Sequence, residues 1–328
     1  MSLTATAVGA AAFLAWVDAL PPPDHRPEIT LAYRYQADIY QQIAEAIEAS
    51  PRPIEVERLG TSAGDRPIWA FHLRPPSGKE TDRALVIGGI HALEWLSTEV
   101  ATETLLWAAA TPPEGVALTV IPLLNPDGRA KVEADLSAAV NRYRRGNQAN
   151  VDLNRDFSVN REARGPWQRV IPGYYHTSPG PLSQPESRAL DALLARERYQ
   201  RAVSLHAFGR YIYYPWSGRF ARPEDWRALD ALALEMSAAQ DRPYNATQLG
   251  RWAFFFRALG SEIDHMYGHY GVQAFLIELG PSGLRPWRPS TFRDYFSWYN
   301  PVDPRRHVRA GLQATKAMIR HRDATTSR

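Results

Sequence analysis

Residues 84–95 read ALVIGGIHALEW, a continuous apolar run that meets two glycines and then His91 and Glu94. An unbroken apolar run such as residues 84–90 is typical of a strand that is buried on both faces of a sheet. Residues 98–110 follow with a helical pattern, and residues 116–124 form a second apolar strand. A strand, a helix and a strand in this order favour a parallel sheet. This region therefore predicts an α/β fold.

The segments on either side fit the same architecture. Apolar residues recur at helical spacing over residues 35–49, and residues 54–59 and 67–73 alternate around a turn, which predicts a hairpin. Further helices are expected at residues 184–197, 223–239 and 304–321, and further strands at residues 202–206, 211–214 and 273–278. We therefore expect a single α/β domain with a mixed, mainly parallel central sheet flanked by helices.

Two segments lack a clear pattern of helix or strand. Asn125-Pro126-Asp127-Gly128 predicts a tight turn after the second apolar strand. Residues 158–186 are rich in Pro, Gly, Arg and Tyr, and we expect them to form a long loop over a surface or a site. Residues 174–176 of this loop (Tyr-Tyr-His) could contact a substrate, although an ordinary loop role is favoured.

The composition of the chain excludes several classes of function. With no cysteine among its 328 residues, the chain has no disulfide, no thiol nucleophile and no cysteine ligand, so a metal would have to bind His, Asp or Glu. The 38 Lys and Arg nearly balance the 35 Asp and Glu, and no basic run marks a nucleic-acid footprint. No apolar stretch reaches the roughly 18–20 residues that a membrane-spanning helix needs.

Three predicted strand ends carry side chains that bind metals or accept protons. His91 and Glu94 lie three residues apart where a strand enters a helix, so one turn can direct both at one cation. His206 ends the strand at residues 202–206, and Glu278 closes the apolar run at residues 274–277. Sites of α/β proteins lie at the carboxyl ends of strands, and a catalytic zinc ion takes three protein ligands plus water. His91, Glu94 and His206 are therefore candidate metal ligands.

A second pair of histidines offers a rival metal site. His265 and His269 are four residues apart, so they would share one face of a helix. Gly268 is expected to break that helix, whereas the first set already has a coherent base and cationic group in Glu278 and Arg145. We therefore favour the first set.

Taken in order, these motifs resemble the zinc metallocarboxypeptidases of the pancreatic carboxypeptidase superfamily over about residues 31–320. The resemblance rests on the following residues: His91 and Glu94, Asn125-Pro126-Asp127-Gly128, Arg145, Asp152, Asn154-Arg155, Ser204-Leu205-His206 and Glu278. It implies one zinc ion held by His91, Glu94 and His206. It also implies that Glu278 is the general base, that Arg145 stabilises the oxyanion, and that Asn154 and Arg155 hold a terminal carboxylate. Asp152 would orient His91.

The resemblance also carries expectations about the substrate, which would be a peptide with a free C-terminus. Ile263 would line the floor of the specificity pocket, which implies an apolar or neutral C-terminal side chain. Arg251 and Arg257 could instead favour an acidic group, although arginines in an arginine-rich chain are usually solvated. Phe256 stands where the pancreatic enzymes carry a mobile tyrosine, so assistance from a phenol hydroxyl is not expected.

Other functions stay open at this level. A related cell-wall amidase would cut the γ-D-glutamyl bond beside diaminopimelate in a muropeptide, which also presents carboxylates. An acyl-amino-acid deacylase would use the same zinc ligands. A catalytically inactive peptide-binding module would keep the fold and the ability to bind peptides, but the presence of Glu278, Arg145 and all three candidate ligands argues against it. The oligomeric state is not addressed by the sequence.

The N-terminal segment has two readings. Residues 7–17 are apolar and rich in Ala, which suits either a helix that ends before the prolines at 21–23 or a cleaved secretory signal. The helix is favoured because no basic residue precedes the segment. We expect an N-terminal extension over residues 1–30, a catalytic domain over residues 31–320 and a tail over residues 321–328. A cytoplasmic location is favoured, with a periplasmic or secreted one left open.

Overall fold

The computed structural model describes residues 3–21, 25–162 and 177–322. The strands are β1 (Glu55–Thr61), β2 (Pro67–Leu73), β3 (Asp82–Ile87), β4 (Val116–Ile121), β5 (Arg201–Ala207), β6 (Tyr211–Tyr214), β7 (Asn245–Gln248) and β8 (Gln273–Leu279). They form one eight-stranded sheet in the order β1-β2-β4-β3-β5-β8-β6-β7. The pairs β3–β4, β3–β5, β5–β8 and β6–β7 are parallel, and the other neighbours are antiparallel. The sheet is therefore mixed, as the sequence predicts.

The helices are α1 (Leu3–Asp18), α2 (Gln36–Ala49), α3 (Trp95–Ala110), α4 (Pro126–Ser137), α6 (Pro185–Glu197), α7 (Trp226–Ala238), α8 (Glu262–Tyr270), α9 (Tyr295–Tyr299) and α10 (Arg305–Arg320). Short 3-10 turns lie at Glu28–Thr30, Leu153–Arg155, Leu249–Arg251 and Pro289–Arg293. No helix in the described ranges is long and apolar enough to cross a membrane.

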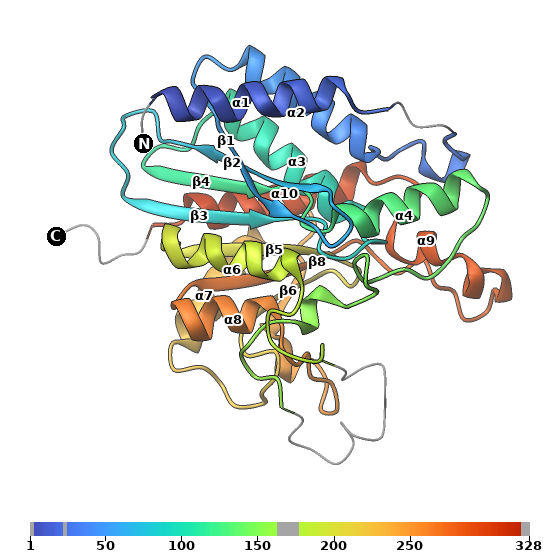
Figure 1. The fold of residues 1–328 in the computed structure, drawn as a ribbon. Helices are drawn as coiled ribbons and strands as arrows, with labels where there is room; N and C mark the ends of the chain where they lie inside the picture. The colour runs from blue at the N-terminus through green and yellow to red at the C-terminus, as the bar shows by residue number, and fades with distance from the viewer. Residues whose placement is uncertain (1–2, 22–24, 163–176, 323–328) are drawn as a thin grey trace.

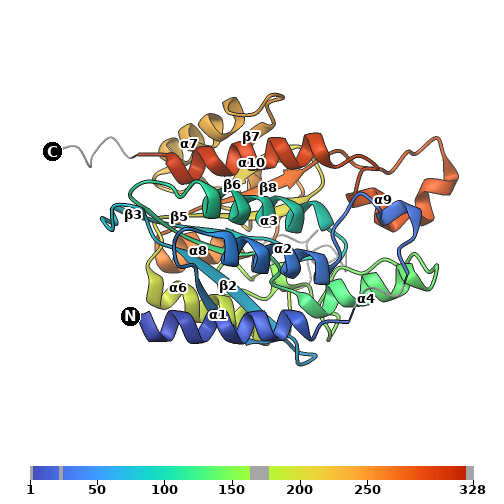
Figure 2. The same cartoon turned by 90° about the horizontal axis from the view of Figure 1, so that it is seen from above.

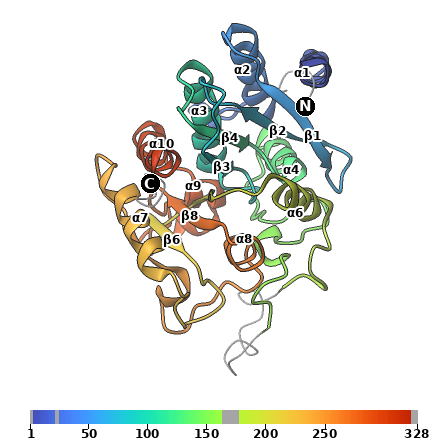
Figure 3. The same ribbon diagram turned by 90° about the vertical axis from the view of Figure 1, so that its left-hand side faces the viewer.

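Helices cover both faces of the sheet (Figure 1). Helices α1, α2, α3, α10 and α7 lie on one face, as Figure 2 shows from above, whereas α6 and α8 lie on the other (Figure 3). Val86 belongs to the core cluster under the first layer, and its neighbour Leu85 belongs to the cluster under the second. Because successive side chains of a strand point to opposite faces, a strand between two helical layers must be apolar throughout. This explains the unbroken apolar runs.

Most predicted elements are confirmed, with boundaries that shift by a few residues. The segment Asn125–Gly128 differs, because it begins helix α4 instead of forming an isolated turn. The Asn125 side chain accepts a hydrogen bond from the Gly128 N–H at 2.9 Å, and Pro126 stands at the first helical position. Both features are typical of a helix N-terminus.

Helix α8 corrects a second expectation, since it continues through Gly268 to Tyr270. A Cβ atom at Gly268 would lie 2.9 Å from the Trp216 ring, so glycine here permits close packing of the helix. The weak helix propensity of glycine is overridden by this tertiary contact. The middle of the predicted loop, including residues 174–176, lies outside the described residues.

The N-terminal segment forms helix α1, which packs against β1 and α2. Phe13 is fully buried, and its ring lies 5.1 Å from that of Phe71 and 5.3 Å from that of Trp69 on β2. Apolar side chains of α1 therefore form part of the hydrophobic core. The division into residues 1–30, 31–320 and 321–328 stays a prediction.

Candidate active site

The carboxyl ends of β3, β5 and β8 bring the candidate metal ligands together. His91 and Glu94 follow β3, and His206 lies in β5 opposite Glu278 of β8 in the parallel register. Among the described residues, His91, Glu94 and His206 form a buried group whose donor atoms all lie within 4.8 Å of one another. The Nδ1 atom of His91 lies 2.8 Å from Glu94 Oε1 and 3.1 Å from the Nδ1 atom of His206.

Glu94 is fixed between both histidines and the backbone of β5. Its Oε2 atom lies 3.1 Å from His206 Nδ1 and accepts a hydrogen bond from the Ala207 N–H at 3.0 Å. Burial by itself would raise the pKa of Glu94, but His91 and His206 lower it below its usual range. Glu94 is therefore an anion that faces two imidazole nitrogens.

Asp152 and Arg145 hold the other side of His91. Asp152 Oδ1 lies 3.0 Å from His91 Nε2, and Arg145 donates to Asp152 Oδ2 at 2.7 Å and to Glu94 Oε1 at 3.0 Å. Burial alone would raise the pKa of Asp152, whereas Arg145 and His91 hold it well below its usual range. An ionised Asp152 accepts the Nε2 hydrogen of His91, so the Nδ1 lone pair points at the centre of the group.

Glu262 holds His206 in the same way, although the sequence analysis did not single it out. Its Oε1 atom lies 2.8 Å from His206 Nε2, and burial of His206 is outweighed by Glu262, which raises the His206 pKa. Glu262 begins helix α8 after the N-cap residue Ser261. An acidic residue in the first helical turn is ordinarily read as a surface residue favoured by the helix dipole, so the sequence gives no signal for this role.

Glu278 lies beside this group, and one of its carboxylate oxygens forms no hydrogen bond with a described residue. Its Oε2 atom is buried and has no hydrogen-bond partner in the described part of the chain. Burial and the nearby Glu94 carboxylate raise the pKa of Glu278 above its usual range. A carboxyl group with a raised pKa and a free oxygen suits proton transfer.

A cavity of about 690 Å³ opens over these residues. The charged and polar residues that line it include Glu94, Arg145, Asp152, Asn154, Arg155, His206 and Glu278. Another part of the lining is apolar or aromatic and includes Tyr211, Tyr213, Leu249, Trp252, Phe256, Ala258 and Leu276. One chamber therefore combines two of the candidate metal ligands, three arginines (Arg145, Arg155 and Arg210) and an apolar wall.

A model of the family described as zinc carboxypeptidase matches residues 39–293, which is most of the chain. The chain belongs to the zinc carboxypeptidase family. Carboxypeptidase A2 of Mus musculus is 25% identical over 273 residues, which cover 77% of this chain and 63% of that protein. The inactive metallocarboxypeptidase ECM14 of Saccharomyces cerevisiae is 26% identical over 284 residues, covering 76% of this chain and 64% of that protein. The chain thus spans less than two thirds of the length of these relatives.

Solved structures resemble this zinc carboxypeptidase family member in fold. Bovine thrombin-activatable fibrinolysis inhibitor, in complex with tick carboxypeptidase inhibitor, superposes with a TM-score of 0.70 at 20% sequence identity. The superposition covers 88% of this chain and 96% of that chain. The architecture of a single domain with a mixed sheet between helices is therefore shared.

The side chains in the candidate metal centre suit the ion that the family name implies. Zinc binds His nitrogen at about 2.0–2.1 Å and carboxylate oxygen at about 2.0–2.2 Å. Two Nδ1 atoms 3.1 Å apart, each on a ring whose Nε2 atom lies near a carboxylate, can both approach one ion. His91, Glu94 and His206 could therefore hold a single zinc ion.

Several residues linked to specificity in the sequence analysis lie outside the cavity. Ile263 is fully buried in the core cluster between α8 and the sheet, and it does not line the cavity. Arg251 and Arg257 are also absent from the lining, and both guanidinium groups lie over the Phe220 ring. Phe256 does line the cavity.

His265 of the rival pair on α8 has a structural role. Its Nδ1 atom lies 2.8 Å from Ser158 Oγ, and its Nε2 atom lies 2.8 Å from Asp191 Oδ1. Both ring nitrogens of His265 are thus engaged, and His265 and His269 do not appear among the metal-type groups of the described residues. His265 thus ties α8 to α6.

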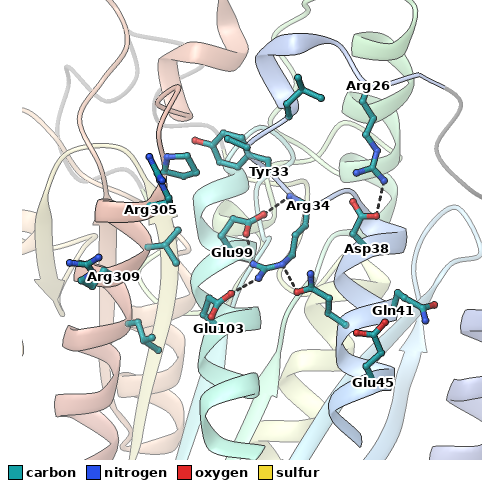
Figure 4. A pocket seen from close by; sticks show the side chains of 16 residues that line it. Arg26, Tyr33, Arg34, Asp38, Gln41, Glu45, Glu99, Glu103, Arg305 and Arg309 are labelled. Atoms are coloured by element: carbon teal, nitrogen blue, oxygen red, sulfur yellow. Dashed lines mark hydrogen bonds and ion pairs between the residues drawn. The ribbon is translucent and has the colours of Figure 1, made fainter. Parts of the chain in front are cut away.

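A second cavity, of about 810 Å³, lies between α2, α3 and α10 (Figure 4). Arg34 points into it and forms ion pairs with Glu99 and Glu103 of α3. Arg26 pairs with Asp38 at 2.7 Å. None of the candidate site residues lines this cavity.

Proposed function

We propose that this chain is a zinc-dependent metallocarboxypeptidase that hydrolyses the C-terminal peptide bond of peptides. The observation that carries the proposal is the buried group of His91, Glu94 and His206 beside Glu278, inside a cavity that arginines also line. His91, Glu94 and His206 would hold one zinc ion. Membership of the zinc carboxypeptidase family supports the assignment.

The reaction would use a water molecule and two protein side chains. A bound zinc ion would supply Lewis acidity, polarising the scissile carbonyl and making a bound water more acidic. Glu278 would take a proton from the attacking water on its free Oε2 atom and later deliver it to the leaving amine nitrogen. Arg145 would donate hydrogen bonds to the oxygen that becomes negative during attack.

Recognition of the C-terminal carboxylate of a peptide would depend on Arg155 and Asn154. Both line the cavity, and the Asn154 side-chain oxygen accepts a hydrogen bond from the Glu262 N–H at 3.2 Å, which fixes the orientation of the amide. A guanidinium group can bind a carboxylate through two parallel hydrogen bonds. A free C-terminus would therefore bind better than an amidated one, which makes the chain an exopeptidase.

The C-terminal side chain of the substrate would face the apolar wall of the cavity. Leu249, Ala258 and Leu276 contribute aliphatic surface, and Tyr213 adds an aromatic ring. A charged side chain in such surroundings would lose hydration without a partner. We therefore expect a preference for apolar or aromatic C-terminal residues.

The experiment that tests the proposal uses four substrate types with the zinc-loaded protein. These are peptides with a free C-terminus, the same peptides amidated, a muropeptide with a γ-D-glutamyl-diaminopimelate bond, and an acyl-amino acid. Release of single amino acids from the free peptides, abolished by a chelator and restored by zinc, is the expected result. Peptides ending in Phe, Leu, Lys and Glu would rank the C-terminal preference.

The other substrates distinguish the competing functions. Cleavage of the muropeptide alone would contradict the proposal in favour of a cell-wall amidase, and turnover of the acyl-amino acid alone would indicate a deacylase. Peptide binding without any turnover would indicate an inactive module, as the name of the yeast relative illustrates for that protein.

A further inference from the structure

Glu262 is a buried carboxylate that the proposed reaction does not use. Its side chain is completely inaccessible to solvent at the start of α8. The Oε1 atom lies 2.8 Å from His206 Nε2, and the Oε2 atom has no hydrogen-bond partner in the described part of the chain. A carboxylate in this position needs an explanation, because burying a charge without compensation is unfavourable.

Comparison with another buried glutamate argues against a purely structural role. Glu186 in α6 is equally inaccessible, but it uses both oxygens to hold the fold together. Its Oε1 atom accepts from the Ala63 N–H at 3.1 Å, and its Oε2 atom accepts from Asn147 at 3.0 Å. Among the described residues, Glu262 has His206 as its side-chain hydrogen-bond partner. The charge of Glu262 is therefore compensated at His206.

The arrangement around His206 repeats the one around His91. Asp152 lies 3.0 Å from His91 Nε2 as Glu262 lies 2.8 Å from His206 Nε2, so both imidazoles present Nδ1 to the centre of the group. Asn154 connects the two acidic residues: its N–H donates to Asp152 at 2.9 Å, and its side-chain oxygen accepts from the Glu262 N–H. Asn154 thus helps to fix the positions of both Asp152 and Glu262.

Ser204 is the one alternative partner in the described residues for the same nitrogen. Its hydroxyl lies 3.1 Å from His206 Nε2. A hydroxyl is neutral and can turn to donate or accept, so it does not fix which ring nitrogen carries the hydrogen. A carboxylate only accepts, and it therefore selects the form of His206 in which Nε2 carries the hydrogen and Nδ1 is free.

We propose that Glu262 is a positioning residue for the metal centre, which holds the Nε2 hydrogen of His206 and so aims Nδ1 at the ion. This inference rests on the part of the proposed function that assigns His206 as a zinc ligand. Partners of this kind typically contribute about 10- to 100-fold to metal affinity. We therefore expect a substitution of Glu262 to weaken zinc binding first and to lower peptide turnover as a consequence.

Zinc affinity of the full-length chain, measured by competition with a chromogenic chelator, tests the inference. Glu262→Gln keeps the shape but loses the charge, and we expect zinc to bind about 10- to 100-fold more weakly. Glu262→Asp keeps the charge but is too short to reach Nε2, so it should weaken binding as well. Glu186→Gln is the matched control, for which we expect an unchanged zinc affinity. Ser204→Ala should lose less zinc affinity than Glu262→Gln.

Two further measurements separate positioning from folding. The thermal midpoint of each metal-free variant reports on the fold, and the visible absorption of the Co²⁺-substituted protein reports on ligand geometry. We expect the cobalt spectrum to change in both Glu262 variants and to stay unchanged in Glu186→Gln. If Glu262→Gln does not fold, the zinc affinity and the cobalt spectrum of Glu262→Asp test the inference instead.

The outcomes distinguish this inference from the proposed function. A wild-type chain that binds no zinc would overturn the proposed function itself. A wild-type chain that binds zinc, with Glu262 variants that match Glu186→Gln in affinity and spectrum, would overturn the positioning role alone. A larger loss in Ser204→Ala than in Glu262→Gln would also overturn it, by assigning the role to the hydroxyl.

Discussion

At the scale of single residues, the environment of a carboxyl group decides what it can do. Glu94 and Glu278 both reach the cavity, yet their pKa values move in opposite directions. Glu94 faces two imidazoles, which stabilise its anion, whereas Glu278 is desolvated beside Glu94, which disfavours a second negative charge. This difference supports Glu94 as a metal ligand and Glu278 as the group that moves a proton.

The first prediction concerns Glu278. We expect Glu278→Gln to lose about 10²- to 10⁴-fold in kcat, because the amide cannot accept the proton of the attacking water. Zinc content measured by atomic emission should stay at the wild-type level, since Glu278 is not among the three candidate ligands. A variant that retains the wild-type rate would end the assignment of Glu278 as general base.

The second prediction concerns Arg155. Removing its guanidinium group in Arg155→Ala should lower kcat/KM for peptides with a free C-terminus by about 10- to 100-fold, because a charge-assisted hydrogen bond to the carboxylate is lost. Activity on amidated peptides, measured in parallel, should change little, because they lack that carboxylate. Equal losses on both substrate types would contradict a role of Arg155 in binding the C-terminal carboxylate.

At the scale of elements, α1 is a layer of the core as well as an N-terminal segment. Its aromatic residue Phe13 packs edge-on against rings of β2 and against Tyr40 of α2. An apolar helix that covers an edge hairpin removes surface that would otherwise be exposed. Helix α1 therefore contributes to the stability of β1 and β2.

The third prediction follows from this packing. Phe13→Ala should lower the free energy of unfolding by about 3–5 kcal/mol, because it removes a large buried ring and leaves a cavity. Denaturant titration would measure the loss, and Val8→Ala, at a position 69% exposed on the same helix, is the control with little effect. A loss for Phe13→Ala as small as that for Val8→Ala would mean that α1 is an accessory segment.

The fourth prediction concerns the pH dependence of stability through His307 in α10. Burial, helped by the nearby Arg306 and Arg210 and opposed by Asp303, lowers the pKa of His307 from 6.5 to about 4. The unfolded chain thus binds a proton between pH 6.5 and 4 that the folded chain does not. The contribution of His307 is present above pH 6.5 and is lost as the pH falls towards 4.

Comparison of wild type with His307→Gln isolates this contribution from the other titrating groups. The free energy of unfolding of the wild type should fall more steeply between pH 6.5 and 4 than that of the variant. Parallel curves for the two proteins would show that His307 titrates alike in the folded and unfolded states.

At the scale of the whole molecule, the candidate metal centre joins strands that are distant in the sequence. His91 and Glu94 follow β3, His206 lies in β5 and Glu262 begins α8. An ion bound by the folded chain alone stabilises it according to the ratio of free ion to dissociation constant. Metal binding and folding are therefore coupled.

The fifth prediction is that zinc stabilises the entire domain. At a free zinc concentration about 1,000 times the dissociation constant, the gain is about 4 kcal/mol, and a chelator should lower the thermal midpoint accordingly. His206→Ala should make the midpoint insensitive to zinc. An unchanged midpoint for the wild type with and without zinc would contradict a specific site.

The predictable part of this protein is the part that local patterns encode. Continuous apolar runs fix β3, β4, β5 and β8 as strands buried on both faces, and the ends of these strands carry His206 and Glu278. Helix α4 was not predicted, because its local cap by Asn125 was interpreted as a tight turn. The continuation of helix α8 through Gly268 was not predicted either, because it involves packing against Trp216, a residue that is distant in the chain.

The sequence by itself determined the fold class and the candidate ligands, because strand burial and the order of motifs are properties of consecutive residues. Only the tertiary structure decided that Glu262 holds His206, that Ile263 is buried in the core away from the cavity, and that Leu249 and Leu276 form part of its apolar wall. The physical reason is that a helix start places successive side chains in different directions, and the packing of α8 against the sheet selects which of them reaches the site.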